Sequence, residues 1–187
     1  MAYFDNIENA KEYIKMAEGI DGTYLVNIFK EHLDEGSIVL ELGMGPGKDL
    51  DELKKCYKVI GSDKSKAFLD LYSEQNKDIE LLLLDAKTLR VDRKFDGLYS
   101  NKVLIHLDKK ELKESINRQY DILNNNGIAL HSFWKGDTEE IVDDLKFVYY
   151  EKEELKKLFS EKFKIIDIDY YTEMEYEDSI YIVIKKT

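Results

Sequence analysis

The sequence predicts an α/β protein built on a doubly wound, mostly parallel sheet of seven strands with an antiparallel hairpin at its C-terminal end. Three observations predict this fold. Short apolar runs alternate with helical segments through the middle of the chain, as they do in β-α-β units. A glycine-rich turn follows the first apolar run. Near the C-terminus, two strand-like runs are joined by a link too short for a parallel crossover, so they should pair antiparallel.

The first 36 residues are expected to form a helical cover. Ala10 and Tyr13 are spaced to lie on one face of a helix. Asp21 is placed to cap a second helix, and Gly36 lies just past the end of its apolar stripe.

Residues 37–134 are expected to hold five parallel strands and the helices between them. Strands are predicted at residues 38–42, 57–62, 79–84, 95–100 and 128–133, and helices at residues 49–55, 66–73 and 109–123. The asparagine-rich run at residues 124–127 predicts a turn before the fifth strand. Strands and helices that alternate in this way imply right-handed crossovers.

Residues 135–187 should complete a single domain. The region 135–161 is short and acidic, and we expect it to be mostly helical, with a helix at 153–159. The edge hairpin is predicted from the strand-like runs at residues 164–171 and 179–184.

Composition and charge limit the classes of partner. The chain of 187 residues carries 28 basic and 39 acidic side chains, a formal net charge of −11. Nucleic-acid binding draws most of its affinity from Lys and Arg on phosphates, so we expect no nucleic-acid partner. No apolar run is long enough for a membrane span and no signal peptide is readable, so a cytoplasmic protein without a membrane partner is expected. A single cysteine, Cys56, excludes a disulfide framework.

The glycine-rich turn, ELGMGPG at residues 41–47, is the most informative segment. Glycines between a strand and a helix allow positive φ and let a ligand approach the backbone closely. A phosphate-binding P-loop needs four residues between its glycines and then Lys followed by Ser or Thr, whereas Asp49 follows Lys48 here. A dinucleotide-binding turn needs its third glycine at the position of Lys48, so that alternative is weakened and stays open.

Five motifs in order resemble those of the class I S-adenosylmethionine-dependent methyltransferases, between about residues 37 and 134. IVLELGMGPG is similar to the family's first motif, in which an acidic residue precedes a glycine turn. Asp63 follows the second strand and Asp85 the third, as the family's acidic residues do. FDGLYSNKVLIHL and ILNNNGIALHSF resemble the segments around the family's fourth and fifth strands. The resemblance implies a Rossmann-like fold, S-adenosylmethionine as cofactor and a small-molecule substrate.

The resemblance also implies roles for individual residues. Asp63 would hold the ribose hydroxyls and Asp85 the adenine amino group, with the N–H of Ala86 near a ring nitrogen. Glu41 would order the glycine turn beside the ammonium end of the cofactor. The alternative for Asp63 is a cap on the helix that begins near Ser65. The cofactor-binding residues implied by the resemblance are Glu41, Gly43, Met44, Gly45, Gly47, Asp63, Lys64, Asp85, Ala86, Ser100 and Asn101.

Methyl transfer is an in-line displacement, in which the alignment of the nucleophile with the methyl group supplies much of the catalysis. His106, after the fourth strand, is the candidate general base, and the alternative is a structural histidine. Tyr13, Phe133 and Trp134 are candidate substrate contacts, with packing in the core as the alternative.

The expected function is methyl transfer to an oxygen or nitrogen of a small molecule. Ser100 stands where catechol-type relatives carry a metal-binding acid, so no metal is expected. The alternatives are a methyltransferase that acts on a protein or an RNA-linked target, and a non-catalytic module that binds S-adenosylmethionine. The sequence leaves the oligomeric state open.

Overall fold

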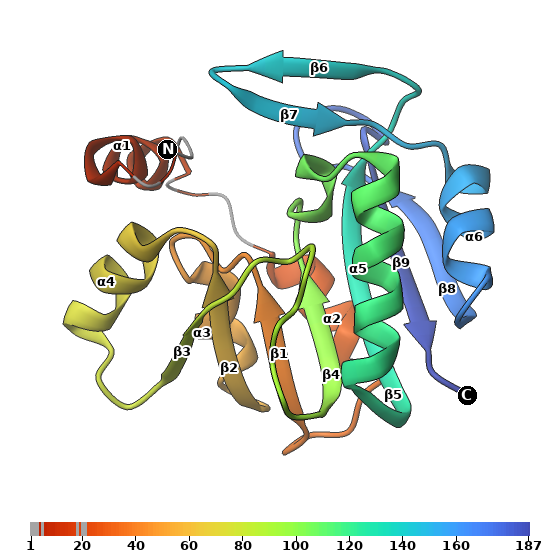
Figure 1. Cartoon of the computed structure of the whole chain (residues 1–187), viewed down its shortest axis with the longest axis horizontal. Coiled ribbons are helices and arrows are strands. Elements are labelled where there is room, and N and C mark those ends of the chain that lie inside the picture. Colours follow the sequence, from red (N-terminus) through yellow and green to blue (C-terminus); the bar gives the residue numbers. More distant parts are fainter. Residues whose placement is uncertain (1–3, 5, 18, 20–21) are drawn as a thin grey trace.

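A computed structural model describes residue 4, residues 6–17, residue 19 and residues 22–187, and one seven-stranded sheet runs through it (Figure 1). The strands are β1 (Ile38–Leu42), β2 (Lys58–Asp63), β3 (Glu80–Leu83), β4 (Phe95–Ser100), β5 (Leu123–Trp134), β8 (Lys164–Tyr171) and β9 (Ser179–Lys185). Their order is β3-β2-β1-β4-β5-β9-β8. β1 to β5 pair in parallel, and β9 is antiparallel to both of its neighbours. The predicted fold class is confirmed.

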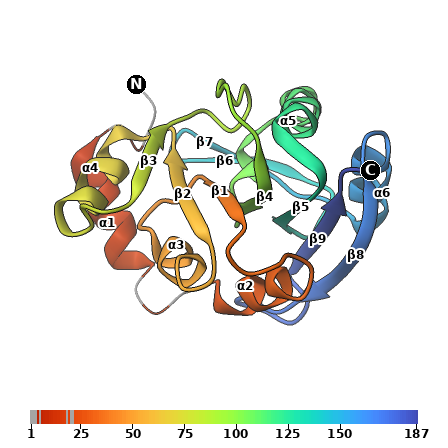
Figure 2. The same cartoon turned by 90° about the horizontal axis from the view of Figure 1, so that it is seen from below.

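Helices cover both faces of the sheet, as Figure 2 shows in the view from below. The helices are α1 (Ile7–Met16), α2 (Thr23–Lys30), α3 (Lys48–Leu53), α4 (Lys66–Gln75), α5 (Lys109–Ile122) and α6 (Lys152–Ser160), with a short 3₁₀ turn η2 (Leu104–His106). One hydrophobic core joins α5 and α6 to one face, and a second joins α2 and α3 to the other. Gly22 occupies the N-cap of α2, whereas Asp21, the predicted cap, lies outside the described residues.

The region 135–161 differs from the prediction of a mostly helical segment. It forms a two-stranded hairpin, β6 (Glu139–Val142) with β7 (Leu145–Val148), and only α6 is helical. Asp143 and Asp144 join the two strands with φ of 50° and 63°. Short acidic side chains tolerate this left-handed backbone, which a two-residue hairpin loop requires.

The predicted turn at residues 124–127 is a bulge within β5. Leu123 pairs with Phe95 and Ile128 pairs with Gly97, so four residues of β5 lie opposite Asp96 alone. Asn124 donates a hydrogen bond of 2.8 Å to the Asp96 carboxylate, which holds the bulge in place.

The carboxyl ends of the parallel strands point to the end of the molecule where α1 and the β6–β7 hairpin lie (Figure 1). Loops at these strand ends are where open α/β sheets bind ligands. Within the described ranges, no helix is long and apolar enough to cross a membrane.

Candidate functional site

The glycine turn between β1 and α3 needs glycine at each of its three positions of positive φ. Gly43, Gly45 and Gly47 have φ of 63°, 48° and 82°. A Cβ on Gly43 would lie under 3.0 Å from Val103, and one on Gly47 would lie under 3.0 Å from the Tyr72 ring. The backbone of the turn therefore runs in close contact with its surroundings, which only glycine permits.

Asp63, at the end of β2, connects the second strand to the glycine turn. Its Oδ2 accepts from the Gly45 N–H at 2.9 Å, and its Oδ1 accepts from the Ser65 N–H at 2.8 Å. The hydroxyl of Ser65 caps α4 by accepting from the Phe68 N–H. Asp63 is therefore not the cap. Burial raises the pKa of Asp63, while hydrogen bonds from three backbone N–H groups oppose the rise.

Asp85 and Lys64 lie together at the ends of β3 and β2. The Lys64 Nζ is 3.3 Å from Asp85 Oδ2, and Asp85 Oδ1 accepts from the Lys87 N–H. A third of the Asp85 side chain is exposed. Next to it, the carbonyl of Ala86 accepts from the Ser115 hydroxyl.

Glu41 is a carboxyl group buried beneath the glycine turn, with 3% of its surface exposed. Its Oε2 has no hydrogen-bond partner among the described residues. Burial, followed by the carboxylates of Asp49, Asp63 and Asp51, raises the pKa of Glu41 well above its usual range. A buried acceptor without a partner is costly, and a ligand that donates to it removes that cost.

Asp49, in the first turn of α3, is a site residue that the sequence reasoning did not assign. Its Oδ1 accepts from the Gly22 N–H at 2.7 Å. Its Oδ2 accepts from the Tyr99 hydroxyl at 2.8 Å and from Asn101 Nδ2 at 3.1 Å. Asp49 thus joins α2, α3 and the end of β4. An acidic residue two positions after the last glycine was the available signal.

Ser100 and Asn101 were predicted together, but their side chains lie apart. The Ser100 hydroxyl bonds His131 Nδ1 at 2.8 Å inside the protein, and its side chain does not reach the site. His131 Nε2 lies 2.8 Å from Gln119 Oε1. Burial lowers the pKa of His131 to about 3, so this ring is neutral and structural. The side chain of Asn101, by contrast, faces Asp49.

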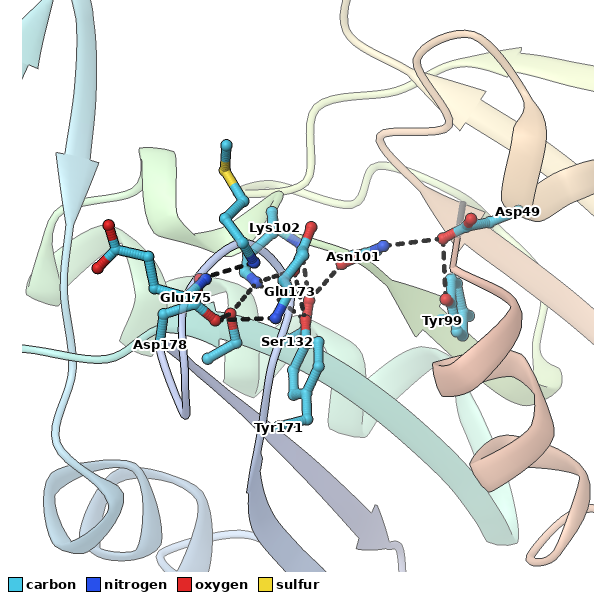
Figure 3. A network of polar contacts seen from close by, with 11 residues as sticks. Asp49, Tyr99, Asn101, Lys102, Ser132, Tyr171, Glu173, Glu175 and Asp178 are labelled. Carbon is cyan, nitrogen blue, oxygen red and sulfur yellow. Dashed lines mark hydrogen bonds and ion pairs between the residues drawn. The ribbon is translucent and has the colours of Figure 1, made fainter. Parts of the chain in front are cut away.

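A network of polar contacts continues from Asn101 toward the C-terminal strands (Figure 3). The Ser132 hydroxyl donates to Asn101 Oδ1 at 2.6 Å and accepts from the Lys102 N–H at 2.9 Å. Lys102 Nζ donates to the Tyr171 hydroxyl at 2.9 Å and to the Glu173 carboxylate. Burial lowers the pKa of Lys102, while Glu173 opposes the change. These bonds fix the wall of a cavity.

That cavity has a volume of about 230 Å³ and opens between α2, the end of β4 and the link from β8 to β9. Its wall includes Gly22, Tyr24, Leu25, Asn101, Tyr171 and Glu173. Trp134, a predicted substrate contact, is not among the residues that line this cavity, and Lys102 Nζ lies 3.8 Å from its ring centroid.

The other two predicted substrate contacts pack against aromatic neighbours. Phe133 is fully buried between Tyr150 and Phe159, so it belongs to the core and does not line the site. Successive residues of a strand face opposite sides, and Phe133 lies on the side of β5 that faces the core. Tyr13 packs edge-on against Phe68 and lies 3.9 Å from a Cβ placed on Gly45, so it covers the glycine turn.

His106, the candidate base, lies against the β6–β7 hairpin. Its Nδ1 is 2.7 Å from the Lys146 carbonyl oxygen, so Nδ1 carries the proton and donates. Its ring packs edge-on against Phe147 with centroids 4.8 Å apart. Burial lowers the pKa of His106, and the bond to Lys146 opposes the change. His106 does not line the cavity beside Asn101. In the part of the chain that the structure describes, no three His, Cys, Asp or Glu residues cluster as metal ligands.

A mostly parallel sheet with one reversed strand, a glycine turn after β1 and acidic residues near the ends of β1 and β2 and just after β3 form the arrangement of a Rossmann-like methyltransferase fold. Comparison with known proteins agrees. Residues 39–127 match the family model described as a methyltransferase domain. Over these residues the chain is similar to methyltransferase domains, and its fold is the one seen in class I S-adenosylmethionine-dependent methyltransferases.

One curated relative and two solved structures illustrate the similarity. The chain is 31% identical over 117 residues to a tRNA (carboxymethyluridine(34)-5-O)-methyltransferase of Arabidopsis thaliana, a match that covers 62% of this chain and 28% of that protein. A structure of a methyltransferase from Clostridium acetobutylicum superposes with a TM-score of 0.77 at 15% identity, covering 97% of this chain and 99% of the other.

The second structure is the 1,6-didemethyltoxoflavin-N1-methyltransferase of Burkholderia thailandensis, with 1,6-didemethyltoxoflavin and S-adenosylhomocysteine bound. It superposes with a TM-score of 0.73 at 18% identity and covers 86% of this chain and 76% of the other. At this level of identity, both structures establish the shared fold.

Proposed function

We propose that the protein transfers the methyl group of S-adenosylmethionine to an oxygen or nitrogen nucleophile of a small molecule by direct displacement. The cofactor supplies a methyl group on a sulfonium, which is already activated toward displacement. The protein then has to bind the cofactor, hold the acceptor in line with the methyl group and keep water out.

The residues at the strand ends fit this cofactor. Glu41 holds a buried acceptor oxygen without a partner, which suits the donor groups of the cofactor's ammonium. Asp63 would accept from the ribose hydroxyls, and the partly exposed Asp85 would accept from the adenine amino group. The tight glycine turn would bring backbone N–H groups to the ligand.

The observation that carries the small-molecule assignment is the cavity beside Asn101. Its volume of about 230 Å³ suits a small metabolite. Asn101 in the cavity wall donates a hydrogen bond to Asp49, which lies two residues after the last glycine of the turn. The net charge of −11 also disfavours a polyanionic acceptor.

An RNA-linked acceptor is a second candidate, and the plant tRNA methyltransferase favours it. The chain spans little more than a quarter of that protein's length, so residues beyond the shared region could bind its RNA. With an acidic chain, RNA binding would need a basic partner or a local basic patch.

Ligand-induced stabilisation tests the cofactor. At a ligand concentration of about 100 times Kd, binding should raise the unfolding free energy by about 2.7 kcal/mol. We expect a rise in Tm with S-adenosylmethionine and with S-adenosylhomocysteine, and none with NAD or ATP. A rise with NAD alone would contradict the proposal.

Label transfer tests the acceptor class. Protein supplied with S-adenosylmethionine tritiated in its methyl group is incubated with a metabolite extract or with total tRNA. We expect label in the low-mass fraction, and Asp63→Ala as the control should reduce it. Label in tRNA alone would support the second candidate.

A further inference from the structure

Among the described residues that line the cavity beside Asn101, Glu173 is the one with a charged side chain. Lys102 and Tyr171 both donate to Oε2 of this carboxylate, the latter at 2.9 Å. No described residue donates to Oε1. One oxygen therefore holds the carboxylate in place, and the other is left for a bound molecule.

Buried contacts fix the position of Glu173. Lys102, the cation that holds it, is only 12% exposed and also donates to Ser179 at 2.9 Å. The Lys102 ammonium also lies over the ring of Trp134, 3.8 Å from its centroid. A carboxylate held by a lysine and a tyrosine has lost most of its rotational freedom, so a ligand that binds it meets a preorganised acceptor.

The surroundings of the cavity favour a positively charged group. Burial raises the pKa of Tyr13, and the carboxylates of Glu173, Asp63 and Asp49 raise it further. Tyr13 covers the glycine turn, so the negative potential of these three groups extends from the cavity to the turn. At the mouth of the cavity, the rings of Tyr24 and Tyr171 stack with centroids 5.6 Å apart at 28°. Aromatic faces attract ammonium groups.

We infer that this cavity receives the methyl acceptor, that the acceptor is an amine, and that Glu173 binds its nitrogen. The inference rests on the proposed function and narrows its acceptor from oxygen or nitrogen to nitrogen. The amine binds in its ammonium form and donates an N–H to Glu173 Oε1. It then gives one proton to solvent, which frees the lone pair that attacks the methyl carbon.

The displacement balances without a base. The nitrogen lone pair forms the new N–C bond while the C–S bond breaks and its electron pair returns to sulfur. The positive charge moves from the sulfonium to the nitrogen, where the Glu173 carboxylate stabilises it as it develops. An alcohol holds its proton far more tightly than an ammonium does and would need a base, and His106, the candidate base, does not line this cavity.

Probe molecules matched in size test the inference. The protein is saturated with S-adenosylhomocysteine and titrated with 2-phenylethylamine, 2-phenylethanol and phenylacetate, and then with propylamine, propanol and propionate. Calorimetry gives the Kd of each. We expect at least one amine to bind at least tenfold more tightly than its matched alcohol and acid.

Substitutions then locate the binding. Glu173→Gln should weaken the binding of the amine at least tenfold and keep the Kd for S-adenosylhomocysteine within twofold of the wild-type value. Glu175→Gln removes an exposed carboxylate from the same link and should change neither value. Because Glu173→Gln leaves Lys102 buried without its counter-ion, Lys102→Met combined with Glu173→Gln keeps the test valid if the single variant is unstable.

The outcomes separate the two proposals. Tight binding of an acid would mean that Lys102 recognises an anion, and this would overturn the inference while the proposed function stands. Equal binding of amine and alcohol, or no binding of any amine, would overturn it in the same way. Failure to bind S-adenosylhomocysteine would overturn the proposed function and the inference with it.

Discussion

Substitution of Gly47 by Ala should damage both the stability of the protein and the binding of its cofactor. Gly47 has φ of 82°, and a Cβ there would lie under 3.0 Å from two ring carbons of Tyr72. The Tyr72 hydroxyl donates to Asp51 at 2.8 Å, so the ring cannot move away without losing this bond. The new methyl group therefore has to displace the turn.

Gly36→Ala separates the two costs of this substitution. Gly36 has φ of 80°, and no atom lies within 4 Å of a Cβ placed on it. Ala at this position should lower the unfolding free energy only by the cost of the left-handed backbone, about 1–2 kcal/mol. Ala at Gly47 should add about 1–3 kcal/mol for the crowded contact, a total of about 2–5 kcal/mol.

Urea unfolding of both variants measures these costs, and calorimetry measures the affinity for S-adenosylhomocysteine. Gly47→Ala should weaken that affinity more than tenfold because the turn moves, whereas Gly36→Ala should leave it unchanged. Tyr72→Ala in the Gly47→Ala background makes room for the methyl group, so the remaining cost should approach that of Gly36→Ala. Equal losses in the two single variants would refute the contact argument.

Three further substitutions test other parts of the structure. Asp63→Ala should weaken binding of S-adenosylhomocysteine by about 1–3 kcal/mol, and calorimetry showing unchanged affinity in a folded variant would contradict its role. The pKa of His131 is about 3 in the folded protein against 6.5 ordinarily. Protonation of His131 therefore favours the unfolded chain, so the folded protein keeps its full stability above about pH 6.5 and loses stability as the pH falls. Between pH 7 and pH 5 the unfolding free energy of the wild type, measured in urea, should fall by about 2 kcal/mol more than that of His131→Gln. An equal fall in both proteins would contradict this. His106→Ala removes the bond to the Lys146 carbonyl, so hydrogen exchange in the β6–β7 hairpin should accelerate while cofactor affinity stays the same. Unchanged exchange with lost turnover would instead make His106 the base.

The sequence predicted the main sheet because each of its strands has a local signal. The apolar runs of β1, β4 and β8 gave their bounds as the structure has them. The β6–β7 hairpin carries no such signal. All four residues of β6 are exposed, so no alternation of buried and exposed positions marks the strand. A short acidic segment with this pattern resembles a solvated helix as much as a strand.

The gathering of acidic residues at one edge of the sheet was predictable for a similar reason. Glu41, Asp63 and Asp85 each lie near or just after the end of a strand, and parallel strands bring their carboxyl ends to one edge. Local sequence therefore determines which side chains meet there. The cavity wall has no such local signal, since Tyr24 and Glu173 come from opposite ends of the chain and meet only through tertiary packing.

Ser100 and Phe133 show how a single position along a strand decides between site and core. Successive residues of a strand face opposite sides, so of two neighbours at a strand end only one turns its side chain toward the site. Ser100 bonds His131 inside the core, whereas Asn101, the next residue, reaches Asp49. In β5, Phe133 packs in the core, whereas the preceding Ser132 bonds Asn101.

The hydrogen bonds from Asp49 through Asn101, Ser132 and Lys102 to Glu173 connect the glycine turn to the cavity. Every group in this series is at least partly buried, so each depends on its neighbour to satisfy its hydrogen-bonding capacity. A cofactor that orders the glycine turn would then also favour the arrangement that holds Glu173. Thermodynamic linkage makes the two effects equal in size. An acceptor bound at Glu173 should therefore increase the affinity for the cofactor by the same factor by which the cofactor increases the affinity for the acceptor.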